Sequence, residues 1–262
     1  MSKRTASTLV IVIAVAFLTL AIAGCAGAKS ESTSTQQAEG SDAQSVAYLP
    51  TRKIQFNSDG SIYADFKYEY DERGCLLRTT VSLEDSFVAS LYGATTHESS
   101  DYNEQGYLER EQYGDSVYTF EFEYAGDRAI RVTASSGDTT LLEYHDNGIM
   151  KSRTGIDADG NVNLEQEFDE DGYLIKQRYR NNDGSYGESA ITWEKDSNGM
   201  AIRFTSSDFS DMRRSYTIEN DEHGNFVKLY DSAGRLYEEF EYKAFPNACP
   251  ASWVNSHIRE IL

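Results

Sequence analysis

Residues 70–76 read Tyr-Asp-Glu-Arg-Gly-Cys-Leu, and residues 230–236 read Tyr-Asp-Ser-Ala-Gly-Arg-Leu. Each stretch has an aromatic residue, three residues typical of turns, a Gly, one variable position and an apolar residue. The same order recurs at 56–62, 102–108, 144–150 and 168–174, and with an aliphatic first residue at 156–162. Copies at 193–199 and 218–226 suggest longer loops, and 124–130 is a degenerate copy. A unit repeated this often indicates one structural element used many times.

The spacing within the unit predicts a β-hairpin with a fixed register. Asp71 at the first turn position can bond forward to the backbone, and Gly74 at the fourth can adopt a positive φ. A type I turn followed by such a Gly gives a three-residue hairpin with a G1 bulge. In that register Asp71 faces both Gly74 and Cys75, and Tyr70 lies opposite Leu76 on one face of the sheet. Each unit therefore encodes one hairpin and its buried face.

The segments between the turns alternate in polarity, as β-strands do. One face of residues 118–124 carries Tyr118, Phe120, Phe122 and Tyr124, and the other carries Thr119, Glu121 and Glu123. The chain also has 18 Tyr and 12 Phe against 3 Pro, a composition that favours strands. We therefore predict an all-β fold, an antiparallel meander of repeated hairpins that forms a curled sheet or an open barrel-like array. The runs 81–100 and 204–214 lack the pattern and are expected to be strand plus longer loop.

The repeat resembles the YD repeat of Rhs-type surface proteins and of bacterial lipoproteins built from related repeats. The resemblance extends from about residue 56 to residue 242, and the Tyr-Asp pair itself is intact at 70–71 and 230–231. It implies a continuous antiparallel array of hairpins, either spiralled into a shell or curled into an open barrel-like sheet. In long Rhs proteins the array encloses a toxin cargo, for which we expect this chain to be too short.

The first residues have the layout of a secretory signal peptide. Lys3 and Arg4 precede an apolar run over 9–23, and Cys25 follows Ala-Gly. The segment is similar to a bacterial lipoprotein signal, with Ile22 where Leu is more usual. The resemblance implies cleavage before Cys25 and acyl chains, such as palmitate, on Cys25. Such chains would hold an extracytoplasmic protein on a bacterial cell membrane. The alternative is an uncleaved N-terminal anchor.

Three segments are expected to follow from this reading: a signal peptide at 1–24, the lipidated Cys25 with a tether over 25–46, and the repeat domain over 47–262. The tether is rich in Ser, Thr and Gln and has too few apolar residues to fold. After Pro246 and Pro250, Val254, Ile258, Ile261 and Leu262 fall at helical spacing. They predict a short C-terminal helix that covers an open end or edge of the sheet, with a surface docking helix as the alternative.

The formal charge is −19, and it becomes −21 when the two positive charges of Lys3 and Arg4 are removed with the signal peptide. A field of this sign repels nucleic acid and anionic headgroups. We therefore expect no nucleic-acid partner. Solvent-facing Glu and Asp on the strands account for the charge, and a basic or neutral partner is the alternative explanation.

Cys75 and Cys249 are left once Cys25 carries lipid. Outside the cytoplasm two such residues can form a disulfide, which here would link an early hairpin to the C-terminal end. Two separate buried thiols are the alternative. The spacing of Cys and His does not predict a zinc site.

The sequence holds no recognisable catalytic motif, so we expect no enzyme activity, no cofactor and no metal. The Asp-rich turns at 157–161 and 169–172 invite a calcium hypothesis. The EF-hand pattern, however, requires Gly at the sixth position, where this chain has Val162. Turn chemistry explains these Asp residues without a metal.

Tyr107, Tyr173 and Tyr237 each follow a repeat at a position expected to face away from the core pairs. Amphipathic rings on such a face can stack on sugars, so the three are candidate ligand-stacking residues. The alternatives are that both faces of the sheet are partly covered, or that the three are ordinary β-formers.

These observations predict a lipid-anchored protein of the cell envelope with a non-catalytic β-repeat domain. Its role would be that of a binding or structural module for a protein or glycan partner. A hydrolase or lyase acting on polysaccharides is the alternative function, and a passive surface spacer is another.

Overall fold

The computed structural model describes residues 46–83, 96–113, 116–181, 183–207, 213–246 and 248. The strands in these ranges are β1 (Ala47–Phe56), β2 (Ile62–Tyr70), β3 (Leu76–Leu83), β4 (Thr96–Tyr102), β5 (Leu108–Tyr113), β6 (Ser116–Ala125), β7 (Arg128–Ala134), β8 (Thr139–Tyr144), β9 (Met150–Ile156), β10 (Val162–Phe168), β11 (Leu174–Arg180), β12 (Tyr186–Lys195), β13 (Ala201–Ser207), β14 (Arg213–Asn220), β15 (Phe226–Tyr230) and β16 (Leu236–Phe245). The predicted all-β class is confirmed. Cys25, the tether, Cys249 and the predicted C-terminal helix lie outside the described residues.

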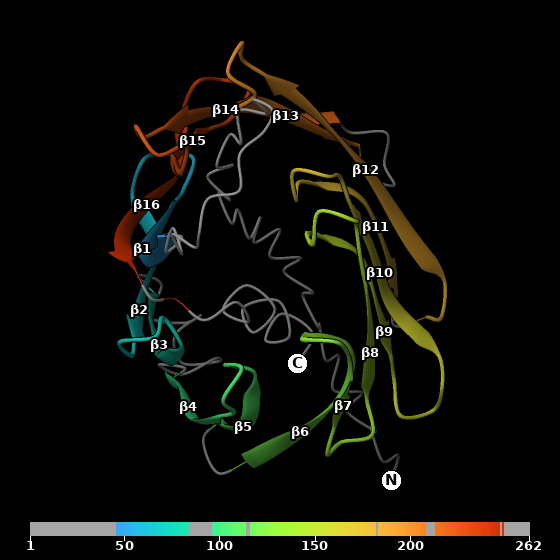
Figure 1. Cartoon of the computed structure of the whole chain (residues 1–262). Helices are drawn as coiled ribbons and strands as arrows, with labels where there is room; N and C mark the ends of the chain where they lie inside the picture. The colour runs from blue at the N-terminus through green and yellow to red at the C-terminus, as the bar shows by residue number, and fades with distance from the viewer. Residues whose placement is uncertain are drawn as a thin grey trace, which may run out of the picture.

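Each strand pairs antiparallel with the next, so the predicted meander is confirmed, and β1 also pairs with β16. Figure 1 shows the resulting ring of strands, with the blue first strand beside the red last strand. The β1–β16 register runs from Ala47 opposite Phe245 to Gln55 opposite Glu238. The sheet therefore closes on itself and goes beyond the open array that the repeats suggest. No helix in the described ranges is long and apolar enough to cross a membrane.

The turns have the predicted geometry. Asp71 N–H donates to the Cys75 carbonyl at 2.9 Å, and Gly74 N–H donates to the Asp71 carbonyl at 3.1 Å. Gly74 has φ of 71°, in the left-handed region that a G1 bulge requires. Tyr70 lies opposite Leu76, and the register shifts by one residue beyond this pair, between Glu69 and Tyr70. The hairpin register predicted from the sequence is therefore confirmed.

The longer loops predicted at 193–199 and 218–226 are wrong. Both hairpins have the same turn as the others, with Lys195 opposite Ala201 and Asn220 opposite Phe226. Lys195 and Asn220 occupy the position that an aromatic residue fills elsewhere. Because neither is aromatic, the first position of the repeat was matched two residues too early, to Trp193 and Ile218, and the predicted loops were too long. Turns of the same hydrogen-bond pattern also follow Thr133 and Arg180. The degenerate copy at 124–130 instead has a two-residue turn between Ala125 and Arg128.

The two faces of the sheet differ in chemistry. In β6, Phe120 is buried while Glu121 and Glu123 are exposed, as the alternation predicts. The exposed face carries cross-strand ion pairs, such as Arg178–Glu165 at 2.7 Å and Lys176–Glu188 at 3.5 Å. Because the ring is a single layer, the face with the buried side chains is its inner face.

The two ends of the ring differ in what emerges from them. In an antiparallel meander all turns that follow even-numbered strands lie at one end, together with the start of β1 and the finish of β16. We call this end the entry rim. It includes the β8–β9, β10–β11 and β12–β13 turns and both ends of the described chain. The remaining turns form the far rim.

Candidate functional site

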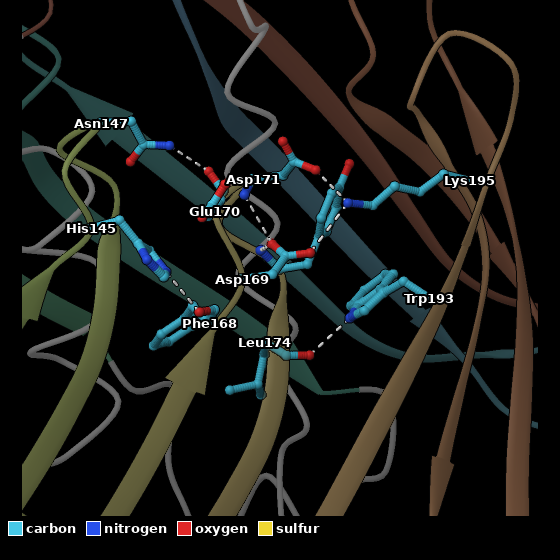
Figure 2. Close-up of polar contacts among 10 residues, drawn as sticks. His145, Asn147, Phe168, Asp169, Glu170, Asp171, Leu174, Trp193 and Lys195 are labelled. Carbon is cyan, nitrogen blue, oxygen red and sulfur yellow. Dashed lines mark hydrogen bonds and ion pairs between the residues drawn. The ribbon is translucent and has the colours of Figure 1, made fainter.

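The candidate site starts at the entry rim, where the β10–β11 turn meets the end of β12. The Asp169 carboxylate accepts hydrogen bonds from the backbone N–H groups of Asp171 and Tyr173, at 3.1 and 2.8 Å. These bonds give the turn its shape. They also leave the second carboxylate oxygen of Asp169 and the Asp171 side chain directed at the neighbouring hairpin, as Figure 2 shows.

Lys195 bridges the two hairpins. Its ammonium donates to Asp169 Oδ2 at 3.2 Å and to Asp171 Oδ2, and it lies 4.6 Å from the centre of the Tyr173 ring. Burial lowers the pKa of Lys195, but the hydrogen bonds to Asp171 and Asp169 outweigh that effect, so its pKa is raised. Lys195 is therefore a fixed positive charge on a rim whose turns are mostly acidic.

A continuous row of aromatic rings begins beside this lysine. The row, which we call the aromatic band, consists of Tyr173, Trp193, Phe204, Tyr216 and Tyr237. Consecutive ring centres are 4.8, 5.0, 4.8 and 5.2 Å apart, within the range of favourable aromatic pairs. Phe204 and Tyr216 are buried, Tyr173 and Trp193 are half-buried, and Tyr237 is 39% exposed.

Hydrogen bonds between neighbouring hairpins hold the band in place (Figure 2). Trp193 Nε1 donates to the Leu174 carbonyl at 2.8 Å, which fixes the indole against the adjacent hairpin. On the other side of the β10–β11 turn, His145 Nε2 lies 3.0 Å from the Phe168 carbonyl and Asn147 donates to the Glu170 carbonyl at 2.8 Å. These bonds tie Trp193 and the β10–β11 turn to neighbouring hairpins. Groups that are already held in place lose little additional conformational freedom when a ligand binds.

A polar row runs across the inner face next to the band. Arg153 is 2% exposed, and its Nε donates to Gln166 Oε1 at 2.5 Å. Gln166 Nε2 in turn donates to Gln177 Oε1 at 2.7 Å. The three residues are cross-strand partners in β9, β10 and β11. Hydrogen-bonding polar groups therefore accompany the apolar residues on this face.

A second buried polar cluster lies where the ring closes. Gln55 Nε2 donates to Glu238 Oε1 at 2.7 Å across the β1–β16 pair, and the Lys53 ammonium lies 4.5 Å from the centre of the Phe66 ring. Burial raises the pKa of Glu238, while the charge of Lys53 and the hydrogen bond from Gln55 oppose the rise. This cluster joins the first and last strands, which assigns it to closure of the ring rather than to a ligand.

The three candidate ligand-stacking tyrosines differ in burial and in location. Tyr107 is only 5% exposed; its ring packs 5.1 Å from Phe122, and its hydroxyl accepts a hydrogen bond from Ala129 N–H. The expectation that Tyr107 faces away from the core is therefore wrong, because the residue after the bulge leans onto the neighbouring hairpin. Tyr173 and Tyr237 are both members of the aromatic band.

The band also contains residues that sequence reasoning missed. The sequence predicts Trp193 as the first residue of a repeat with a longer loop rather than as part of a ligand-binding row, and Phe204 falls at the start of a run without the repeat pattern. The signal that could have located Trp193 is its alternation with Ile191 and Lys195 along β12, which places the three residues on one face of the strand.

The Asp residues of the turns bind backbone groups. Asp157 Oδ1 accepts hydrogen bonds from the N–H groups of Asp159 and Asn161, at 3.0 and 2.7 Å. The same pair of bonds is made by Asp221, to His223 and Asn225. Within the described ranges no three His, Cys, Asp or Glu side chains are grouped so that they could hold a metal ion.

No family model and no curated protein matches the chain. Among solved structures, TcdB2-TccC3 without its hypervariable C-terminal region shares 16% identity over 80% of this chain, with a TM-score of 0.36. This chain spans only 11% of the length of that protein. A porin-like protein from Bacteroides vulgatus ATCC 8482 shares 9% identity, covers 74% of this chain and 98% of its own, and has a TM-score of 0.32. Another from Bacteroides uniformis ATCC 8492 shares 14%, covers 74% and 96%, and has a TM-score of 0.31. These similarities are too low to carry an argument about function.

Proposed function

We propose that the protein is a non-catalytic binding module of the cell envelope, and that the aromatic band binds a glycan. The observation that carries the proposal is the continuity of the band from the rim to an exposed end. Tyr173 and Trp193 are half-buried at the entry rim, and Tyr237 is exposed at the other end. Aromatic rings combine an apolar face with a polar edge, and this suits the mixed surface of a sugar.

The polar groups near the band support a glycan over a purely apolar ligand. Gln177 is half-buried and its strand neighbour is Ser189 in β12, the strand that carries Trp193. Amide and hydroxyl groups both donate and accept hydrogen bonds, so they match the hydroxyl groups of a sugar. Binding sites commonly combine an apolar lining with a few such polar groups.

The experiment is a glycan array probed with the full-length protein purified in detergent, followed by titration of any glycan that binds. Tyr237→Ala should weaken binding by roughly fivefold to a hundredfold, the range of about 1–3 kcal/mol measured for ring stacking in other complexes. The matched control is Tyr124→Ala, because Tyr124 is also 39% exposed and packs on another ring, but lies outside the band.

Equal loss in both variants would contradict the assignment of the band as the site. Binding to no glycan would contradict the proposal itself and direct the search to a protein partner. Release of shortened sugars during the titration would favour the hydrolase or lyase alternative.

We also propose that lipid on Cys25 places the module on a bacterial membrane. The proposal is supported by the basic start, the apolar run and the small residues before Cys25. Cys25→Ser should move the protein out of the detergent-extracted membrane fraction, as checked by cell fractionation and by mass spectrometry of the N-terminal peptide. Wild-type protein without acyl groups would refute this anchor.

A further inference from the structure

The aromatic band reaches the far rim at Tyr237, where its last ring is open to solvent. Tyr237 is the second residue of β16 and is 39% exposed. The register with β15 passes from Leu236 directly to Glu238, so Tyr237 is the additional residue of a bulge. Bulges re-aim a side chain away from the regular alternation. The ring of Tyr237 thereby comes to 5.2 Å from that of Tyr216 on β14, across the short strand β15 that lies between them (Figure 1).

Arg214 lies beside this exposed end of the band. It precedes Tyr216 by two residues on β14, so the two side chains emerge on the same face of the strand. The pairing of β14 with β15 begins only at Thr217, which leaves Arg214 beyond the end of β15. Arg214 is exposed, and its guanidinium donates a hydrogen bond to the Tyr216 hydroxyl. A positive charge is therefore held next to the rings at the far rim, within reach of solvent.

The carboxylates near this guanidinium already have partners of their own. Glu238 is buried and accepts a hydrogen bond from Gln55 at 2.7 Å. Asp231 forms an ion pair with Arg235 at 2.7 Å. Within the described ranges, Arg214 itself makes no ion pair with a carboxylate. Its charge is therefore available to a ligand.

Two tyrosine hydroxyl groups lie close to the same charge. Burial raises the pKa of Tyr237 to about 12 and also raises the pKa of Tyr216, while the charge of Arg214 opposes both shifts. Both hydroxyl groups are therefore neutral at physiological pH and can donate hydrogen bonds. A guanidinium with two neighbouring hydroxyl donors is suited to an anion.

We propose that Arg214, Tyr216 and Tyr237 form an acid subsite that binds the carboxylate of an acidic sugar. Given the proposed glycan binding by the aromatic band, on which this assignment rests, the ligand is a glycan that contains uronic or sialic acid residues. A guanidinium offers two parallel N–H groups that match the two oxygens of a carboxylate. The exposed ring of Tyr237 gives the same sugar a face to stack on. A neutral sugar would leave the charge of Arg214 without a partner.

The net charge of the protein does not prevent such binding. The formal charge of −19 repels an anion at long range. At physiological ionic strength, however, the interaction between exposed charges is screened over about 8 Å. The groups in direct contact with the ligand therefore decide its affinity, and the charged group of the acid subsite is positive.

A glycan array probed with the full-length protein in detergent, at about 0.15 M salt, tests the ligand class. The array presents hexuronate and sialic acid oligosaccharides, each beside its methyl ester, together with neutral and sulfated glycans. We expect each carboxylated glycan that binds to do so about tenfold to a hundredfold more tightly than its methyl ester, the range for hydrogen bonds to charged groups. Equal binding of acid and ester, or binding of neutral or sulfated glycans alone, would overturn the acid subsite and leave the proposed glycan binding intact. Binding of no glycan would contradict the proposed function itself.

A substitution of Arg214 tests the position of the subsite. Arg214→Gln should weaken binding of the carboxylated glycan by the same tenfold to hundredfold and leave binding of its methyl ester unchanged. The matched control is Arg203→Gln, which removes a positive charge from an exposed ion pair with Glu194 on the outer face and should change neither affinity. Circular dichroism of both variants checks that the β structure is retained. Equal effects of the two substitutions would show that the charge acts only at long range and would overturn the acid subsite.

Tyr237→Ala distinguishes stacking from recognition of the acid. Because the ring contacts the sugar whether or not its carboxylate is esterified, this variant should weaken binding of acid and ester alike. A loss confined to the ester, or no loss for either, would contradict the placement of the acidic sugar on Tyr237.

Discussion

The glycine at the fourth position of the repeat turn has a positive φ, which any other residue adopts only at a cost in free energy. Gly74 and Gly234 have φ of 71° and 75°, where an L-residue with a Cβ costs roughly 1–2 kcal/mol. They differ in surroundings. A Cβ on Gly74 would press against Leu49 and Ala248, whereas a Cβ on Gly234 would meet no atom within 4 Å. The pair therefore separates backbone strain from packing.

Gly234→Ala should destabilise the protein by about 1–2 kcal/mol through backbone strain alone. Gly74→Ala should cost about 1–3 kcal/mol more, because a tightly packed neighbour must move. Urea unfolding followed by circular dichroism measures both, with unchanged slope as the check on the comparison. Equal losses would show that the contact between Gly74 and Ala248 is loose.

Glu238 and Asp65 lie on neighbours of β1, and their pKa values are shifted in opposite directions. Burial raises the pKa of Glu238, so the native state holds its proton more tightly than the unfolded chain does. The contribution to stability is then most favourable below the ordinary glutamate pKa and declines as the pH rises toward the native value. Hydrogen bonds from Arg52 lower the pKa of Asp65, so its contribution is present above the ordinary aspartate pKa and is lost as the pH falls through the native value.

Glu238→Gln should therefore raise the stability of the protein at neutral pH and change it little in acid, since it removes a buried charge but keeps an acceptor for Gln55. Asp65→Asn, the contrasting variant, should lower stability at neutral pH and have less effect in acid. Thermal unfolding across the acid-to-neutral range gives both profiles. A stability loss for Glu238→Gln that does not vary with pH would show that its role is packing alone.

At the scale of the hairpin, side chains at strand ends bind the backbone of the adjacent hairpin. The hydroxyl groups of Tyr70, Tyr144 and Tyr186 donate to the carbonyls of Pro50, Ala129 and Val162 at 2.7, 2.8 and 3.0 Å. In the β12–β13 and β14–β15 hairpins, whose first position holds Lys195 and Asn220, similar bonds to the preceding hairpin come from Trp193, two residues before Lys195, and from Asn220 itself. The first-position residues Tyr70 and Tyr144 therefore both pack within their own hairpins and join them to the preceding strand or hairpin.

Tyr144→Phe should lower the free energy of unfolding by about 1–3 kcal/mol, because it leaves the Ala129 carbonyl without this bond in a partly buried place. Burial already raises the pKa of Tyr144, which agrees with the limited access of water. Tyr230→Phe is the control, since its hydroxyl bonds to the carboxylate of Glu219 at an exposed position. Unfolding in urea should show a clearly smaller loss for the control, and an equal loss would refute this role for Tyr144.

Hairpin register could be predicted from the sequence because it depends on residues only six positions apart, such as Tyr70 and Leu76. The copies with Thr133 or Arg180 in the aromatic position were not predicted, and those with Lys195 or Asn220 there were predicted with too long a loop. Their turns are determined by the Gly and by backbone hydrogen bonds rather than by the first residue. The aromatic band could not be predicted, because its rings come from strands such as β14 and β16, which carry Tyr216 and Tyr237 and both pair with β15 but not with each other.

At the scale of the whole molecule, closure joins strands at opposite ends of the domain. Gln55 and Glu238 are 183 positions apart, and no local pattern relates them. Nothing in the repeat encodes the number of hairpins at which first and last strand meet. For this reason the curled meander was predictable while the closed ring was not.

The pairing of β1 with β16 also means that the domain has no privileged starting strand. Its seam is an antiparallel strand pair like the others but has no turn, and both ends of the described chain lie at the entry rim. A circular permutant with its old ends joined and new ends opened in another entry-rim turn would keep every strand pair. Gain or loss of one hairpin would keep the antiparallel order too, and would change the width of the enclosed space by a fixed step, since barrel diameter grows with strand number. The size of the interior is thus a variable that can evolve independently of the hairpin itself.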